Sequence, residues 1–355
     1  MIAWPKDVLV LALAFLLSWV ITQFMISFNI QDIPVERSSH KKITPRAGGV
    51  GLLIGFYASV MVQGFSQLPF YEDWISLIIL LCSASVMGLI GFLDDVRGSS
   101  PIFRLLIQIG TAWFLVRCLG AFQTIPFPYL GEINLGSFGL LISILWIVGF
   151  TNVFNFMDGL NGMAGIPTII SCIFLSILTN INHSDFQIHL ILASATFGFL
   201  IFNFPKAKIF LGDVGSFFLG FFFAGWGVLA LRPAYGKFSI WVVPLLFFIY
   251  IYDVIFTRIR RMLKGKGFFE AHCEHLYQLL SRSGWSHVKV TSIYALIFVA
   301  QGIVSIFMIT KPPETHLLFF IPFFVGAIPF TWWILSKART RGLPFKGEKY
   351  DTFTR

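Results

Sequence analysis

The stretch ISLIILLCSASVMGLIGFLDD, residues 75–95, decides the fold class. No charged residue interrupts it before the two aspartates at its end, and about 20 apolar residues cross a bilayer as one helix. Apolar runs of this kind recur along the whole chain. We therefore predict an all-α polytopic membrane protein with about eleven transmembrane helices. They are expected at residues 7–28, 48–68, 75–93, 102–122, 137–156, 163–179, 186–204, 214–231, 238–256, 290–310 and 317–335.

The composition excludes a soluble globule. Of the 355 residues, 56% are hydrophobic and only 12% are charged, whereas a soluble domain has roughly 25% charged residues. The net charge of +9 would suggest a nucleic-acid partner on a soluble protein. In a membrane protein, an excess of Lys and Arg usually sets the orientation instead. We therefore expect the lipid bilayer as a partner and no nucleic acid.

Lys and Arg gather in every second loop between the predicted helices. The positive-inside rule then places the N-terminus outside and the C-terminus in the cytoplasm. We expect one transmembrane catalytic domain at residues 1–336, followed by a basic cytoplasmic tail at 337–355. Its cytoplasmic loops hold nearly all the Asp, His and Gly clusters, so they are predicted to carry the active site. These loops are residues 29–47, 94–104, 157–162, 205–213 and 257–289.

Asp94 and Asp95 form the first candidate site. Adjacent carboxylates at the end of an apolar helix repel each other unless a cation neutralises them. The pair implies a divalent metal or a cationic group of the substrate. The alternative is that the two acids only mark the end of the helix.

A second cluster of polar residues joins the runs 137–156 and 163–179. Asn152, Asn155 and Asp158 are spaced by three residues, which puts them on one face if the helix continues. Gly159 and the later glycines would let a ligand or a second backbone approach closely. The alternative is a helix–helix contact capped by amides.

The third cluster precedes the run 214–231 and includes Asn203, Phe210 and Asp213. Asp213 could be an ordinary N-cap. Two lysines lie nearby, however, and the other predicted acids share this face of the membrane. Four carboxylates match the oxygen ligands that Mg²⁺ prefers, which favours a metal or phosphate site.

Two basic loops complete the candidate site. The longest loop carries Arg258, His272, His275 and Arg282, which fit contacts to a diphosphate. Its arginines could instead serve topology or touch anionic lipid. The first cytoplasmic loop carries Lys41, Thr44 and Arg46, and could clamp a lipid phosphate.

Taken in this order, the motifs resemble those of the bacterial polyprenyl-phosphate N-acetylhexosamine-1-phosphate transferases, glycosyltransferase family 4, which include the phospho-MurNAc-pentapeptide translocase. The resemblance covers the chain from about residue 32 to residue 282. It implies an enzyme of the bacterial inner (cytoplasmic) membrane, with its active site facing the cytoplasm. That family transfers a sugar-1-phosphate from a UDP-sugar to undecaprenyl phosphate with Mg²⁺ and releases UMP. Mn²⁺ is the alternative metal, and a homodimer is considered.

The resemblance also assigns roles to individual residues. Asp213 resembles the family's magnesium ligand, with Asp95 and Asp158 as further candidates. Phe210 resembles the aromatic residue that stacks on uracil. The residues expected to be catalytic are Asp94, Asp95, Asp158, His272 and His275. The residues expected to bind substrate are Lys41, Thr44, Arg46, Asn152, Asn155, Gly159, Leu160, Asn161, Asn203, Phe210, Arg258 and Arg282.

Two departures from the family pattern bear on the branch. Asn161 stands where many members have an aspartate, and the histidine segment reads HCEHLYQ rather than a run of three histidines. With the DIPVERSSH loop at residues 32–40, the chain looks like the branch that initiates O-antigen and related surface polysaccharides. The donor sugar stays open among UDP-GlcNAc, UDP-FucNAc and UDP-QuiNAc.

Three alternatives for the function and mechanism are kept. The first is the peptidoglycan-precursor enzyme, phospho-N-acetylmuramoyl-pentapeptide transferase, which differs in its sugar substrate. The second is an ion-coupled transporter, which the position of the acids at helix ends disfavours. For the mechanism, we expect direct attack by the lipid phosphate, with Asp94 or Asp95 orienting or deprotonating it. A covalent aspartyl-phosphate is the alternative.

Overall fold

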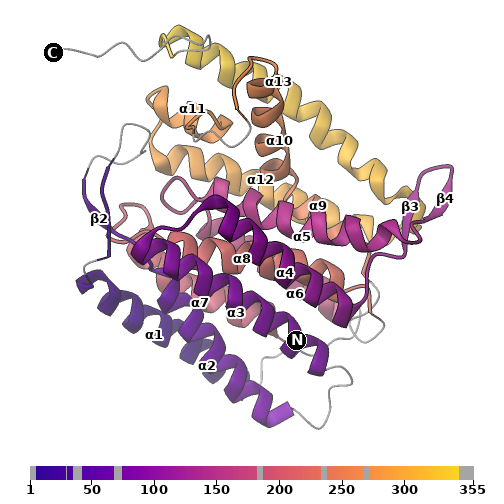
Figure 1. The fold of residues 1–355 in the computed structure, drawn as a ribbon, viewed down its shortest axis with the longest axis horizontal. Coiled ribbons are helices and arrows are strands. Elements are labelled where there is room, and N and C mark those ends of the chain that lie inside the picture. The colour runs from indigo at the N-terminus through magenta and orange to yellow at the C-terminus, as the bar shows by residue number, and fades with distance from the viewer. Residues whose placement is uncertain are drawn as a thin grey trace.

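The computed structural model describes residues 5–28, 30–34, 42–67, 74–181, 187–232, 238–267 and 272–343. It confirms an all-α polytopic membrane protein, with a helix in each predicted apolar run (Figure 1). The helices that follow the predicted runs are α1 (Pro5–Ser27), α2 (Gly49–Gln67), α3 (Trp74–Arg97), α4 (Pro101–Leu119), α5 (Phe138–Met157), α6 (Gly165–Ile181), α7 (Ile188–Asn203), α8 (Gly212–Leu229), α12 (His287–Met308) and α13 (Ile321–Thr340).

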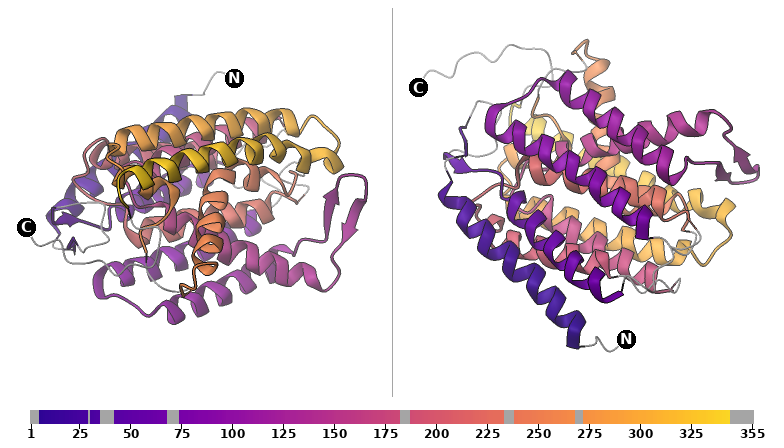
Figure 2. Two further views of the ribbon diagram at one scale, coloured as in Figure 1. Left: turned by 90° about the horizontal axis from the view of Figure 1, so that it is seen from above. Right: turned by 60° about the horizontal axis from the view of Figure 1, so that its bottom comes forward.

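Within the described ranges, seven helical segments are long and apolar enough to cross a membrane, and three further apolar helices are shorter. The predicted run 238–256 is divided at Phe247 into α9 (Val242–Leu246) and α10 (Phe248–Met262). Phe247 has a φ of −111° and a ψ of 19°, which departs from helical geometry between the two segments. As a result, α10 projects from the bundle instead of following the long helices (Figure 2).

Helix α8 forms the centre of the bundle. Its side chains are almost all buried, including Phe221, Phe222, Phe223 and Trp226. Helices α3 and α5 make the largest contacts with it. By contrast, α1, α4 and α13 expose most of their apolar side chains, as expected of helices that face lipid.

Helices α2 and α3 each approach the start of α8 closely at a glycine. A Cβ atom on Gly91 of α3 would lie 2.1 Å from the carbonyl oxygen of Asp213, and one on Gly49 of α2 would lie 2.6 Å from the Cα of Gly215. Only glycine permits this approach. The close contact brings the end of α3, with its two aspartates, against the first turn of α8.

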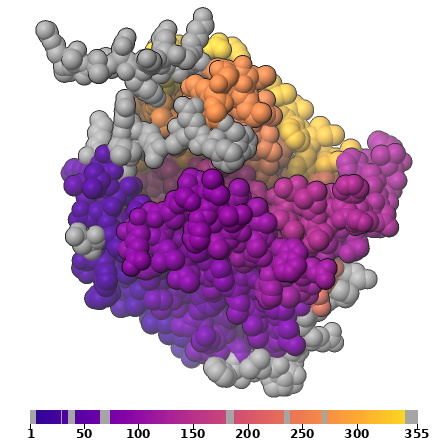
Figure 3. All heavy atoms as spheres, in the orientation of Figure 1, coloured from indigo at the N-terminus to yellow at the C-terminus, as the bar shows by residue number. Residues whose placement is uncertain are grey.

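Two small sheets lie at opposite ends of the bundle (Figure 1). At one end, β1 (Gln31–Asp32) pairs antiparallel with β2 (Thr44–Pro45), and α11 (Leu276–Arg282) lies nearby. At the other, β3 (Thr124–Phe127) pairs antiparallel with β4 (Gly131–Asn134), next to the 3-10 helix η3 (Pro313–Phe320). The β3–β4 hairpin protrudes from the bundle (Figure 3).

The predicted active-site loops contribute to one cleft at the end that carries β1 and β2. Which side of the membrane this end faces stays a prediction, made from the Lys and Arg bias. Of the predicted tail at 337–355, the first residues belong to α13, and residues 344–355 lie outside the described residues.

Candidate active site

A cleft of about 360 Å³ opens between the ends of the helices. Carboxylates, amides, histidines and backbone surround it. Its lining residues are Asp32, Arg46, Asp95, Asn155, Asp158, Gly159, Leu160, Asn161, Asn203, Phe210, Leu211, Gly212, Asp213, His272, Gln278 and His287.

Asp95 fixes the first turn of α8. Its Oδ1 accepts the backbone N–H of Asp213 at 3.1 Å, and its Oδ2 accepts that of Val214 at 3.1 Å. The first N–H groups of a helix have no partner within the helix and favour negative charge. Gly212 has a φ of +78°, and a Cβ there would meet Asp95 Oδ2 at 2.4 Å. Both carboxylate oxygens of Asp95 are thus used to hold α3 and α8 together.

Arg104 of α4 joins the other two acids of this wall. Its Nη1 lies 2.6 Å from Asp94 Oδ2 and 3.6 Å from Asp213 Oδ2. Asp94 also accepts a 2.6 Å hydrogen bond from the hydroxyl of Ser99. Arg104 is therefore the protein's own cation between two carboxylates.

Asn155 orients the Asp213 carboxylate. Its Nδ2 donates to Asp213 Oδ1 at 2.6 Å and to the hydroxyl oxygen of Ser216 at 2.8 Å. Asp213 Oδ1 therefore faces a donor of the protein, while the residue as a whole lines the cleft.

Asp158 lies just past the end of α5, where the chain turns into the Gly159–Leu160–Asn161 segment. Its carboxylate makes no hydrogen bond to any residue that the structure describes. Burial, with the Asp95 charge nearby, raises the pKa of Asp158 well above its usual value. A carboxyl group in such surroundings can hold a proton at a higher pH than a solvent-exposed aspartate.

The opposite wall of the cleft is held by side chains. The Nδ2 of Asn161 donates to the Pro205 carbonyl at 3.1 Å. The backbone carbonyl of Asn161 accepts a hydrogen bond from the Thr291 hydroxyl at 2.9 Å. Asn203 Oδ1 accepts the N–H of Gly162 at 2.7 Å. These bonds fasten the turn after α5 to the loop before α8 and to α12.

Phe210 is held by its main chain. Its N–H donates to the Pro45 carbonyl at 2.8 Å, and its carbonyl accepts from the Gly48 N–H at 2.9 Å. The ring therefore has a fixed base beside Asp213 in the lining of the cleft. An aromatic face in this position could stack on a planar ring.

The histidine segment covers one side of the cleft. His272 lines the cleft, and burial, together with the charges of His275 and Arg261, lowers its pKa to about 3. His272 is therefore neutral at physiological pH. Although burial alone would raise the pKa of Glu274, its bond from Lys266 and the charge of Arg260 hold that pKa below its usual value.

Comparison with known proteins identifies the family. The profile of glycosyl transferase family 4 matches residues 77–231. The probable undecaprenyl-phosphate N-acetylglucosaminyl 1-phosphate transferase of Bacillus subtilis (strain 168) is 32% identical over 284 residues, which cover 79% of this chain and 78% of the relative. The chain belongs to glycosyl transferase family 4.

Two further relatives of the family-4 chain carry related names. The decaprenyl-phosphate N-acetylglucosaminephosphotransferase of Mycobacterium tuberculosis (strain CDC 1551 / Oshkosh) is 31% identical over 301 residues, 77% of this chain and 73% of the relative. A phospho-N-acetylmuramoyl-pentapeptide-transferase of Clostridium perfringens (strain SM101 / Type A) is 29% identical over 321 residues, 83% and 94% of the two chains. The predicted superfamily of polyprenyl-phosphate sugar-1-phosphate transferases is confirmed, and the protein is a membrane enzyme.

Not every residue predicted for the family-4 site lies in the cleft. Those that line it are Arg46, Asp95, Asn155, Asp158, Gly159, Leu160, Asn161, Asn203, Phe210, Asp213 and His272. Those that are described but do not line it are Thr44, Asp94, Asn152, Arg258, His275 and Arg282. Lys41 lies outside the described residues. The roles of all these residues stay predictions.

The residues outside the lining have partners within the protein. Asn152 donates to Gln108 Oε1 at 2.7 Å and so joins α5 to α4. The Arg258 guanidinium lies over the ring of Phe156, 4.7 Å from its centroid. Arg282 donates to the carbonyl of Cys273 at 3.3 Å. In this structure these groups hold the walls rather than face the cavity.

Four residues in or beside the cleft were not predicted as site residues from the sequence: Asp32, Arg104, Gln278 and His287. Gln278 ends the HCEHLYQ segment, so that motif could have indicated it. Asp32 opens the DIPVERSSH loop, which could have indicated it in the same way. Arg104 and His287 reach the site through tertiary packing; His287 begins α12, and its Nδ1 lies 3.4 Å from the backbone N of Asn161.

Oxygen donors dominate the acid wall. Among the described residues, no group of three or more His, Cys, Asp and Glu side chains is arranged to hold a metal ion. Asp158 and Asp213 still offer carboxylate oxygens to the cleft, and hard cations such as Mg²⁺ take carboxylates with substrate phosphates and water rather than complete protein cages. The donor chemistry fits Mg²⁺ or Mn²⁺.

Proposed function

We propose that this protein transfers an N-acetylhexosamine-1-phosphate from a UDP-sugar to undecaprenyl phosphate and releases UMP. The observation that carries the proposal is the single cleft that combines Asp95, Asp158 and Asp213 with Phe210 and a set of amides. The relatives named as N-acetylglucosamine phosphate transferases support the same class of reaction.

The reaction brings two polyanions together, so the site must supply positive charge. Mg²⁺, held by Asp213, would neutralise the diphosphate and polarise its phosphoryl oxygens. Arg46 lines the cleft and Arg104 lies beside Asp213, so both can add cationic contacts to phosphate oxygens. Most of the rate would come from this neutralisation and from in-line positioning.

We favour direct attack by the lipid phosphate. An oxygen of undecaprenyl phosphate forms a bond to the β-phosphorus of the UDP-sugar, the bond from that phosphorus to the bridging oxygen breaks, and UMP leaves. Asp94 and Asp95 were expected to orient or deprotonate the acceptor, but Asp95 is occupied by two backbone N–H groups and Asp94 by Arg104. Asp158 is the better candidate to receive the acceptor's proton, because its carboxylate faces the cleft.

The nucleotide side is assigned to the residues around Phe210. Its ring would stack on uracil, and the Gly159–Leu160 backbone and Asn161 would hydrogen-bond the base. Asn203 would contact the ribose or phosphate side. His272, neutral at physiological pH, would donate or accept a hydrogen bond near the diphosphate or the sugar rather than act as a cation.

For the pathway, we propose initiation of O-antigen or a related surface polysaccharide, with UDP-GlcNAc, UDP-FucNAc or UDP-QuiNAc as donor. The HCEHLYQ segment supports this branch. The second candidate is transfer of phospho-MurNAc-pentapeptide, and the Clostridium perfringens relative, of which 94% is covered, supports it. The proposed location is the bacterial inner membrane with the cleft in the cytoplasm, which the Lys and Arg bias supports.

The deciding experiment measures UMP release by the detergent-purified protein with undecaprenyl phosphate, Mg²⁺ and a panel of UDP-sugars that includes UDP-MurNAc-pentapeptide. Release with one N-acetylhexosamine donor, lost with EDTA and in Asp213→Ala, supports the first candidate. Glu132→Gln, an exposed acid on the distant hairpin, is the matched control and should retain activity. Turnover of the pentapeptide donor alone would favour the second candidate. Absence of UMP release with every donor in the panel would refute both.

A further inference from the structure

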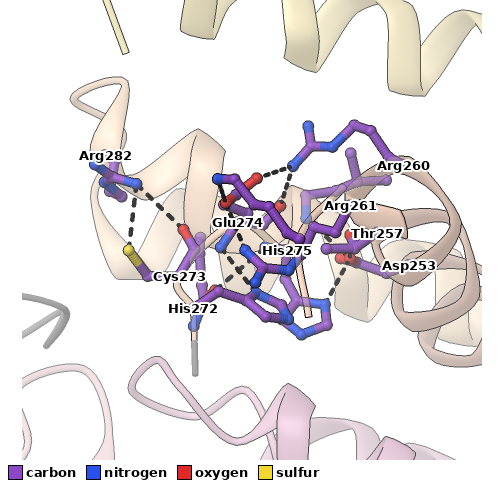
Figure 4. Close-up of polar contacts among 12 residues, drawn as sticks. Asp253, Thr257, Arg260, Arg261, His272, Cys273, Glu274, His275 and Arg282 are labelled. Atoms are coloured by element: carbon purple, nitrogen blue, oxygen red, sulfur yellow. Dashed lines mark hydrogen bonds and ion pairs between the residues drawn. The ribbon is translucent and has the colours of Figure 1, made fainter. Parts of the chain in front are cut away.

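Asp253 is a fully buried carboxylate on α10 that does not line the cleft. Figure 4 shows it beside the histidine segment. Burial of a charged group is unfavourable unless hydrogen bonds replace those to water. Several donors surround the Asp253 carboxylate. Its donors and close partners are the N–H of Leu276 (2.9 Å), the N–H of Tyr277 (3.2 Å), Nδ1 of His275 (3.2 Å), the hydroxyl of Tyr294 (2.9 Å) and the hydroxyl of Thr257 (3.2 Å).

Three of these contacts are to consecutive residues, 275–277, where α11 begins. The Asp253 carboxylate therefore caps the start of α11 from another helix. A second anchor lies on the other side of the segment, where Glu274 bonds Arg261 and Lys266, each at 2.7 Å. Loss of the Asp253 contacts should loosen the segment without releasing it.

Tyr277 connects α11 to the turn that contains Asp158. Its hydroxyl donates to the Phe156 carbonyl at 2.9 Å. A Cβ on Gly159 would lie 2.2 Å from the same hydroxyl oxygen. Any larger residue at position 159 would therefore clash with Tyr277. The two sides of the cleft are in contact here.

His275 lies between Asp253 and His272 and contacts both. Its ring is stacked on those of Phe156 and Tyr277, with centroids 6.1 Å and 6.0 Å away. The ring of His272, which lines the cleft, lies 4.9 Å from it. His275 is thus a packed link between the buried carboxylate and the half-buried histidine that lines the cleft.

We propose that Asp253 is a positioning residue, which sets the place of His272 through His275 and of Asp158 through Tyr277. The inference rests on the proposed transferase function, because it assumes that these two cleft residues serve that reaction. Asp253 itself touches neither substrate.

Cys273 provides a reporter inside the segment that is independent of activity. Its thiol is buried in the native protein. With Cys82, Cys118 and Cys172 replaced by alanine, the rate of maleimide labelling reports how often the segment opens. Asp253→Asn places an amide N–H₂ against donors, so we expect labelling about tenfold faster, equivalent to about 1.4 kcal/mol, and a kcat lowered about tenfold with a smaller change in KM.

Two tyrosine variants separate positioning from general stability. Tyr277→Phe removes the bond to Phe156 but leaves the backbone bond to Asp253, so we expect unchanged labelling and a lowered kcat. Tyr294→Phe removes an equal bond to Asp253 from outside the segment and is the matched control, with a kcat near that of the parent.

The outcomes decide between the ideas. Parental labelling and kcat in Asp253→Asn would overturn the proposal. Where Asp253→Asn fails to fold, Tyr277→Phe decides, and a parental kcat there would overturn it. If the parent protein transfers no sugar-phosphate, the function fails, and faster labelling in Asp253→Asn would still show that Asp253 holds the segment.

Discussion

Asp95 Oδ2 accepts the backbone N–H of Val214 at 3.1 Å, and this bond joins the last turn of α3 to the first turn of α8. The same carboxylate accepts the neighbouring N–H of Asp213. The acid therefore satisfies helix N–H groups that would otherwise lack a partner.

Asp95→Asn replaces one acceptor oxygen by a donor that faces an N–H group. Hydrogen bonds to charged groups are worth about 1.5–3 kcal/mol, so we expect a loss of about 2 kcal/mol in stability together with a loss of activity. The measurement is thermal unfolding in detergent alongside UMP release. A stable but inactive variant would instead assign Asp95 to the chemistry alone.

Gly91→Ala tests the backbone contact between α3 and α8. The added methyl group would lie 2.1 Å from the Asp213 carbonyl oxygen, and overpacking typically costs about 1–3 kcal/mol. We expect a lower unfolding temperature and a loss of activity, because Asp213 must move. Gly110→Ala on α4, where a Cβ has no neighbour within 4 Å, should retain activity and should not lower the unfolding temperature.

Arg104→Gln tests the cation between Asp94 and Asp213. Arg104 and a metal ion compete for the Asp213 carboxylate, so removal of the guanidinium should strengthen metal binding, by about tenfold for a change of about 1.4 kcal/mol. The readout is thermal stabilisation by Mn²⁺ or Mg²⁺ without substrate. Weaker metal binding in the variant would show that Arg104 supports the metal site rather than competes with the ion.

Asp158→Asn should stabilise the protein at neutral pH while it abolishes transfer. The raised pKa means that the folded state holds the proton more tightly than the unfolded state, so the stability of the parent falls as the pH rises from about 4 through that pKa. The asparagine side chain does not ionise, so the stability advantage of the variant over the parent should grow from pH 4 to pH 8. Unfolding temperatures in EDTA across this range provide the measurement, and an advantage independent of pH would contradict the assignment.

The helices and the order of the site motifs could be predicted from the sequence because both depend on local patterns. Apolar runs located the helices, and the acids at their ends indicated one functional end. The run 238–256 was predicted as one helix, because hydropathy locates an apolar run but does not report a change of backbone direction within it, such as the one at Phe247.

The direction of individual side chains could not be predicted. His275 was expected to be catalytic, yet its Nδ1 faces Asp253 inside the protein. Arg104 lies in the predicted loop 94–104 but was not among the predicted site residues, although it lies between two site carboxylates. Both outcomes depend on which helices pack together, and the spacing of residues along one segment does not contain that information.

The two walls of the cleft differ in what a mutation can change. The acid wall is aligned by close main-chain contacts at Gly49 and Gly91 together with the Asp95 carboxylate, so substitution of side chains outside these contacts leaves its acids in register. The facing wall depends on separate side-chain bonds, such as that from Thr291 to Asn161, which can be altered one at a time. Such a molecule can acquire a new donor preference in small steps, while the group-transfer machinery is inherited intact.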